Sequence, residues 1–262
     1  MKNLAQVRIP ETPVRAAPVR FAPGFGQRFI LTVDTEEEFD WTKPISKSGH
    51  TLHSIARLAK FQEFCEAQGV CPVYLIDYPI ATSPLAAEIL RPAVAAGRAE
   101  VGVQLHPWVS PPHDEEVTQF NSFAGNLPKA LEREKFRRLH TAIEQNFGAT
   151  PLIYRAGRYG TGPNTAEILS EHGVAIDSSV RARFDYSTGG GPNYRDHPVT
   201  PYWLDRGNGL MELPLTSVYW GILRQLGPWL YPKLWRTPQL RGALARIGML
   251  ERIPLTPEGV TL

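Results

Sequence analysis

Cysteine is scarce in this sequence, and several other features are missing as well. The only cysteines are Cys65 and Cys71, too few for a disulfide framework or a cysteine-based zinc site, so we interpret both as reduced packing residues. No segment reaches the roughly 20 apolar residues that a membrane span requires. Prolines and arginines interrupt residues 1–27, where a signal peptide needs a continuous apolar run. We therefore expect a cytoplasmic protein without a membrane span.

Neither sign of charge is in excess. The chain has 28 Lys and Arg against 26 Asp and Glu among 262 residues, a formal net charge of +2. Strongly basic proteins are the ones drawn to nucleic acids and anionic membranes, so this balance gives no reason to expect either partner. Aromatic residues are plentiful, with 6 Trp, 9 Tyr and 11 Phe. Their flat faces suit sugars, although packing beneath long loops explains them equally well.

Short apolar runs alternate with helical patterns after a proline-rich stretch at residues 1–27, which we interpret as an extended arm. The predicted strands are 29–34, 73–77, 100–106, 151–157, 174–179 and 211–217. The predicted helices are 52–68, 84–96, 128–146 and 164–171. This alternation indicates an α/β fold in which helices cover a parallel sheet. The length is compatible with one large domain.

The last residues carry the signals of a helix start. Thr256 suits an N-cap, Pro257 the first helical position and Glu258 the first turn, yet the chain ends at Leu262. We therefore expect the domain to be truncated at its C-terminal end, or to be completed by a partner. A missing element would leave a sheet edge that a second copy could cover, so a homo-oligomer is one expectation.

Polar side chains stand at the ends of the predicted strands. They are Asp34, Asp77, His106, Arg155, Asp177 and Glu212. Parallel α/β folds build their sites where strands end, so we expect these side chains to meet. The first of them opens an acidic run that continues through Asp40. Carboxylates so close together raise one another's pKa, so either most of them face solvent or something positive lies there.

A metal ion is one such positive partner. Asp34 and Glu36 are two residues apart and share a face of an extended segment. His106 can supply a nitrogen, Gln104 an amide oxygen, and His113 a further ligand from its loop. The remaining carboxylates of the acidic run, Glu37, Glu38 and Asp40, are expected to face solvent or to bind loop backbone.

Arg155 has two interpretations. Its guanidinium could hold a catalytic carboxylate ionised and oriented, or it could form a salt bridge at the rim of the sheet. Other chemistries are less well supported. No GxSxG elbow and no GxGxxG fingerprint is present. A glycosidase that uses two carboxylates such as Asp34 and Asp177 stays open.

Four motifs together resemble those of the polysaccharide deacetylase superfamily, the group built around the chitin-oligosaccharide deacetylase homology domain and carbohydrate esterase family 4. They are TVDTEEEFDW, EVGVQLHPW, YRAGRYG and IDSSV, in this order within residues 28–218. The DTEEEFDW and LHPW signatures are similar to those of a divergent subgroup. The resemblance implies a distorted (β/α)-barrel of about seven parallel strands over residues 28–262, without its last element.

The resemblance also implies an activity, the metal-dependent hydrolysis of N-acetyl or related acyl groups on a carbohydrate. Asp34 then matches the catalytic base and Arg155 the arginine that holds it. Glu36 falls where related subgroups place a metal carboxylate. His106 is the other metal ligand that we expect, from its position at a strand end, with Gln104, His113 and Asp177 as additional candidates. The implied cofactor is a divalent ion, most simply zinc. Trp108 and Tyr159 are expected to contact the sugar.

This sequence departs from the family pattern at three places. Thr35 replaces the second residue of an Asp-Asp pair, and Gln104 and Trp108 stand where the family has histidines. A late histidine motif would lie beyond Leu262. We therefore keep an alternative of another class, a catalytically silent barrel that binds a glycan or a nucleotide-sugar.

Overall fold

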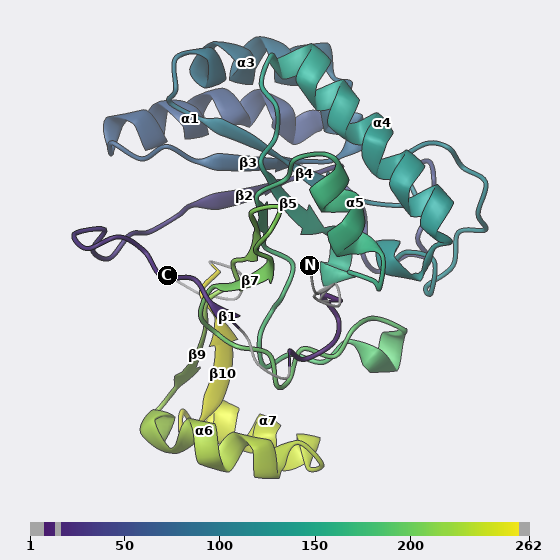
Figure 1. Ribbon diagram of the computed structural model, residues 1–262. Helices are drawn as coiled ribbons and strands as arrows, with labels where there is room; N and C mark the ends of the chain where they lie inside the picture. The colour runs from purple at the N-terminus through teal and green to yellow at the C-terminus, as the bar shows by residue number, and fades with distance from the viewer. Residues whose placement is uncertain (1–7, 14–16, 257–262) are drawn as a thin grey trace.

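One large sheet covered by helices dominates the computed structural model, which describes residues 8–13 and 17–256 (Figure 1). The strand order is β1-β7-β8-β6-β5-β4-β3-β2. The bounds are β1 Ala17–Pro18, β2 Thr32–Thr35, β3 Val73–Ile76, β4 Glu100–Leu105, β5 Ile153–Ala156, β6 Ile176–Asp177, β7 Tyr202–Asp205 and β8 Leu210–Glu212. Neighbours from β2 through β6 to β8 pair in parallel, whereas β7 is antiparallel to β8 and to β1. The predicted α/β fold is confirmed, and the arrangement is consistent with a distorted (β/α)-barrel.

The central strands are buried, and their register builds the site. All four residues of β3 are buried, as are the last five of β4, which fits the apolar composition of strands covered on both faces. Gln104 of β4 pairs with Arg155 of β5, and Asp34 of β2 pairs with Leu75 of β3. Parallel register thus brings side chains that are far apart in sequence to one edge of the sheet.

Helices α1, α3 and α4 lie side by side over one face of this sheet (Figure 1). The helix bounds are α1 Leu58–Ala67, α2 Tyr78–Ala81, α3 Pro84–Ala95, α4 Lys129–Phe147 and α5 Thr165–Glu171. Local signals explain their ends: the Ser83 hydroxyl accepts from the Ala86 N–H at the start of α3, and α4 ends at Gly148 in the left-handed conformation. The four predicted helices are found, although the first begins as a 3-10 turn at His53–Arg57.

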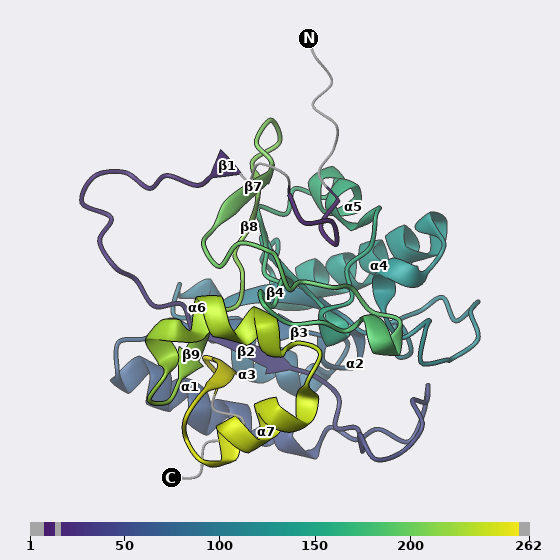
Figure 2. The same ribbon diagram turned by 90° about the horizontal axis from the view of Figure 1, so that it is seen from below.

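One hairpin, β7–β8, and one further antiparallel strand pair were not predicted. The structure divides the predicted strand 211–217 into β8 and β9 (Ser217–Trp220), because Pro214 lacks an N–H for a continuous ladder. A turn that contains Gly209 with φ 76° joins β7 to β8. Strand β9 pairs with β10 (Glu251–Pro254), and between them α6 (Gly227–Leu230) and α7 (Pro238–Arg246) form a separate projection (Figures 1 and 2). A small core of Tyr231, Leu234 and Leu250 lies within it.

The structure can be compared with the expectations about the two ends of the chain, membrane spans and surface charge. Within the described part of residues 1–27, Ile9 is buried in the main core and β1 extends the sheet through β7. The helix predicted to follow Thr256 lies outside the described residues.

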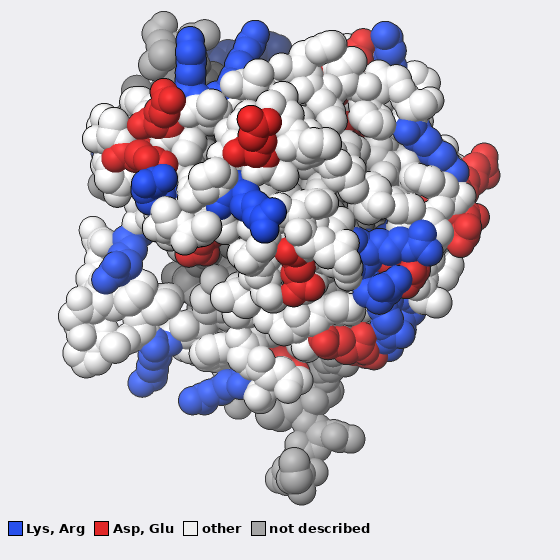
Figure 3. Space-filling model, turned by 90° about the horizontal axis from the view of Figure 1, so that it is seen from above, with Lys and Arg blue, Asp and Glu red and all other residues white. Residues whose placement is uncertain are grey.

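None of the helices in the described ranges is long and apolar enough to cross a bilayer. Acidic and basic side chains are intermingled on the face seen in Figure 3, in keeping with the balanced charge.

Glu132, buried in α4, is expected to make stability depend on pH. Burial raises the pKa of this carboxyl to about 7, although the Thr165 hydroxyl, which donates to it at 2.5 Å, lowers it. The folded state therefore binds the proton more tightly than the unfolded state, and stability falls as pH rises between the unfolded value near 4.5 and about 7. At 1.36 kcal/mol per pKa unit, the loss is about 3 kcal/mol.

Urea unfolding of wild type and Glu132→Gln at pH 5 and pH 8 measures this effect. Glutamine keeps an acceptor for Thr165 but has no proton to lose. The variant should gain about 3 kcal/mol relative to wild type between the two pH values. A constant difference between the two proteins would contradict the assignment.

Candidate active site

Asp34 and Arg155 form an ion pair between two strands of the sheet. Nη1 of Arg155 donates to Oδ1 of Asp34 at 2.5 Å, and the Asp34 side chain is 36% exposed. The rest of the guanidinium is anchored, because Nη2 donates to Thr32 Oγ1 and Nε donates to the Ser178 carbonyl oxygen. The Arg155 side chain is only 5% exposed. A fixed, buried cation therefore holds an accessible carboxylate.

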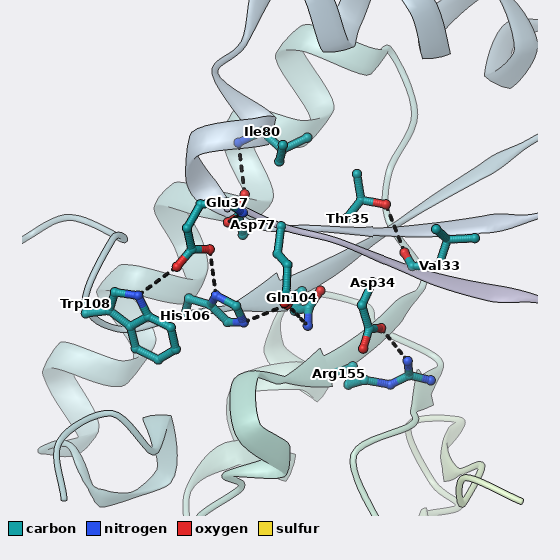
Figure 4. A network of polar contacts seen from close by, with 11 residues as sticks. Val33, Asp34, Thr35, Glu37, Asp77, Ile80, Gln104, His106, Trp108 and Arg155 are labelled. Atoms are coloured by element: carbon teal, nitrogen blue, oxygen red, sulfur yellow. Dashed lines mark hydrogen bonds and ion pairs between the residues drawn. The ribbon is translucent and has the colours of Figure 1, made fainter. Parts of the chain in front are cut away.

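His106 has a carboxylate on each side. Its Nδ1 lies 2.9 Å from Glu37 Oε2, and its Nε2 lies 3.3 Å from Glu36 Oε2. The amide of Gln104 donates to the same oxygen of Glu36 at 2.9 Å. Figure 4 shows His106 between Trp108 and Gln104, with Asp34 and Arg155 beyond Gln104. A carboxylate on one ring nitrogen fixes the ring orientation and presents the other nitrogen to a ligand.

Glu37 is the centre of a buried network behind His106. Its Oε1 accepts from the Trp108 indole at 2.7 Å, and its backbone N–H donates to Asp77 Oδ2 at 2.7 Å. Burial works against ionisation of Glu37, but the charge of His106 and the surrounding hydrogen bonds lower its pKa to about 2. Burial likewise opposes a charge on His106, yet the carboxylates of Glu37 and Glu36 raise the pKa of the ring well above its usual value. Glu37 and the stacked Trp108 together hold the imidazole in one orientation.

The expectation that Glu37 faces solvent is wrong, since the residue is 4% exposed. Burial keeps alternating past the end of β2 at Thr35: Asp34 is exposed and Glu36 half-buried, whereas Glu37 is buried like Thr35, two residues before it. Glu38 and Asp40 follow the expectation. The Glu38 carboxylate accepts from the Ser54 backbone N–H, and Asp40 is exposed.

Two sets of side chains offer ligand atoms to a divalent cation. Glu37, Asp77 and His106 have ligand atoms within 4.8 Å of one another. However, each carboxylate oxygen of Glu37 and Asp77 already has a hydrogen-bond donor. On the other side of His106, Glu36 and Gln104 are available, and the buried Oε1 of Gln104 has no donor among the described residues. This second set fits a cation better, because binding would give an unpaired oxygen a partner.

The second set opens into a cavity of about 310 Å³, here called the site pocket. It is lined by Asp34, Glu36, Trp41, Gln104, His106, Phe123, Arg155, Ala156, Arg158, Tyr159, Arg181 and Tyr186. A larger outer cavity of about 730 Å³ shares Asp34, Glu36 and Trp41 with it. A substrate could therefore extend across the acidic residues from one cavity into the other.

Of the other candidate residues, one lines the site pocket and three do not. Tyr159 lines the site pocket. Trp108 is 1% exposed, and its ring stacks on that of His106 with the ring centroids 4.5 Å apart. Its surface is therefore covered by the protein and is not available to a sugar. His113 is exposed on its loop and is not among the residues that line the pocket. Asp177 is fully buried beside Glu212, and burial raises its pKa to about 6, so it is not placed to act as a second pocket carboxylate.

Sequence reasoning missed the structural role of Lys135. This buried ammonium donates to the carbonyl oxygens of Pro107, Ser110 and Pro112 at 2.9, 2.5 and 2.6 Å, and it pairs with Glu115. It thereby fixes the loop that carries Trp108. A lysine on the helix pattern of α4 gave no signal of this, because charged residues of such helices usually face solvent.

Comparisons with known proteins concern the fold. No protein-family model and no curated protein matches the chain. A solved structure assigned as a polysaccharide deacetylase from Mycobacterium smegmatis is 18% identical over 89% of this chain and 78% of its own, with a TM-score of 0.44. A family 4 acetyl xylan esterase from Clostridium thermocellum, in complex with a cobalt ion, is 15% identical over 60% of each chain, with a TM-score of 0.36. Puue allantoinase is 15% identical over 71% of this chain and 60% of its own, with a TM-score of 0.41.

Proposed function

We propose that this chain is a hydrolase that removes N-acyl groups, such as acetyl, from a carbohydrate. The observation that carries the proposal is the pair of Asp34 and Arg155 in the same pocket as Glu36 and His106. An anchored, accessible carboxylate is what a general base requires. The four sequence motifs point to the same chemistry, and they contribute these residues.

In the proposed reaction, Asp34 takes a proton from water as the water oxygen attacks the acyl carbonyl carbon. The hydrogen bond from Arg155 holds the carboxylate in position in the pocket. The carbon–nitrogen bond then breaks, and the same proton passes from Asp34 to the leaving nitrogen. The products are the free amine and a carboxylic acid, so no further reactant is needed.

The pocket-facing ligands suit a divalent cation, most simply zinc, which binds imidazole nitrogen and carboxylate oxygen. Glu36, His106 Nε2 and Gln104 Oε1 would hold it. Once bound, such an ion would lower the pKa of water and polarise the carbonyl. Glu37 would fix His106 with Nε2 toward the pocket, which is its part in the site whether or not an ion is bound.

Metal content tests the cation site. Protein purified without chelators should contain close to one equivalent of zinc or another divalent ion by elemental analysis. Loss of a group that supports a metal ligand typically weakens metal affinity about 10–100-fold. Loss of a ligand itself should cost at least as much, so Glu36→Ala and His106→Asn should lose the ion on dialysis.

His113→Ala is the matched control, because that histidine lies outside the pocket. Circular dichroism should show that each variant is folded. If folded wild type takes up no ion even when divalent salts are added, the metal-dependent mechanism is wrong, and a glycan-binding barrel becomes the better hypothesis.

A further inference from the structure

Two arginines of the site pocket lack acidic partners among the described residues. Arg155 is paired with Asp34, but neither Arg158 nor Arg181 has a carboxylate of the described residues within ion-pair distance. Both lie on the wall that also includes Phe123, Tyr159 and Tyr186. The pocket therefore has an acidic side and a side with uncompensated positive charge.

The contacts of these two guanidiniums are with neutral groups. Arg158 lies 4.3 Å from the Phe123 ring centroid and donates to the Ser122 hydroxyl. Arg181 lies 4.2 Å from the Phe184 ring centroid and donates to the Tyr186 hydroxyl at 3.2 Å, while its buried Nε has no acceptor among the described residues. Burial lowers the pKa of Arg158, which shows that no neighbouring group of the described residues offsets the cost of burying its charge. An anionic ligand bound beside the guanidinium would offset that cost.

The backbone holds Arg158 in place at a conformational cost. Arg158 and Tyr159 are consecutive non-glycine residues with φ of 56° and 60°. On either side, Gly157 packs against His106, and Gly160 packs against Phe123. Strained conformations of this kind persist where the surrounding packing enforces them, and they concentrate at functional sites.

The outer cavity differs in charge. It is lined by Glu37, Glu38 and Asp40 in addition to the shared Asp34 and Glu36, with Arg57 as its one arginine among the described residues. An anionic group would be repelled there and attracted to Arg158 and Arg181. The two cavities therefore distinguish the ends of a substrate that crosses Asp34.

We infer that the substrate is an N-acylated sugar with an anionic group, a carboxylate or a phosphate, that binds Arg158 and Arg181. This inference rests on the proposed function, because it places the acyl group at Asp34. Charge-assisted hydrogen bonds from guanidinium to these groups are strong and frequently bidentate. The anion thereby selects and orients the sugar beside the base.

Calorimetric titration with two matched pairs of sugars tests the inference. One pair is N-acetylgalactosaminuronic acid and N-acetylgalactosamine, and the other is N-acetylglucosamine 1-phosphate and N-acetylglucosamine. Wild type should bind one anionic sugar about 10-fold or more tighter than its neutral counterpart, since a hydrogen bond to a charged group contributes about 1.5–3 kcal/mol. The pair that shows the preference identifies the anion.

Arg158→Gln and Arg181→Gln should each reduce that preference about 10-fold or more. Arg91→Gln, at an exposed position on α3, is the control and should keep it. Equal binding of the anionic and neutral sugars, or a preference that survives both pocket substitutions in folded protein, would overturn the inference. So would inorganic phosphate that binds as tightly as the sugar phosphate, because the sugar would then play no part.

Binding needs no turnover, so the two proposals can fail separately. A preference for the anionic sugar without any acyl hydrolysis would support the arginine site and contradict the proposed hydrolase activity. Hydrolysis of neutral and anionic sugars at equal kcat/KM would support the hydrolase activity and contradict the arginine site.

Discussion

Asp34→Asn is expected to reduce the rate of acyl hydrolysis about 10²–10⁴-fold, the usual contribution of a positioned general base. Asparagine keeps an oxygen that can accept from Arg155 Nη1, so the geometry of the pair should survive while the basic group is lost. The measurement is kcat for release of acetate from an N-acetylated sugar that wild type hydrolyses. Thermal unfolding of the variant checks that the protein is folded.

Asp40→Asn is the control for this change. It removes one carboxylate from the same acidic run, but at an exposed position outside the site pocket. Its kcat should stay within about a factor of 3 of wild type, because exposed charge pairs contribute only 0–1 kcal/mol. If Asp34→Asn retained more than a tenth of the wild-type rate, Asp34 would not be the base.

Gly157→Ala is expected to be strongly destabilising and to displace His106. A Cβ at this position would lie 2.7 Å from the Leu105 carbonyl oxygen and closer still to Cδ2 of His106. Neither the Leu105 carbonyl nor the His106 ring can move away easily, because Leu105 belongs to β4 and Glu37 holds the imidazole. Overpacking of a core costs about 1–3 kcal/mol and occasionally more, and we expect the upper end of that range. Urea unfolding measures the loss.

Gly242→Ala is the matched control. Gly242 lies within α7, and a Cβ there would meet nothing within 4 Å. Because alanine is the better helix former, this variant should be more stable than wild type by about 0.5–1 kcal/mol. A Gly157→Ala protein as stable as wild type would show that the loop after β5 can move away from His106.

The succession of strands along the chain and the polar residues at their ends could be predicted from the sequence. Short buried strands in parallel place their carboxyl ends at one edge, so Asp34 and Arg155 could be expected to meet although 121 residues separate them. Glu37 could not be placed in the same way. Alternation places Glu37 on the side of Thr35, opposite Asp34 and Glu36, but it does not reveal that protein rather than solvent covers that side.

The sequence also did not predict that Arg158 and Arg181 line the same pocket. Gly157 and Gly160 indicate a turn, but they do not reveal that Arg158 and Tyr159 adopt left-handed conformations, because non-glycine residues rarely do. Arg181 comes from a separate part of the chain, and only the tertiary structure brings it to the same cavity.

The contacts of Lys135 have a consequence for motion. The loop after β4 folds around an ammonium group that the chain itself supplies, much as other loops fold around a bound ion. To open, it must detach three carbonyl groups and Glu115 from one cation whose side chain is 0% exposed. Because Lys135 belongs to α4, we expect this segment to open only when its contacts with that helix are lost.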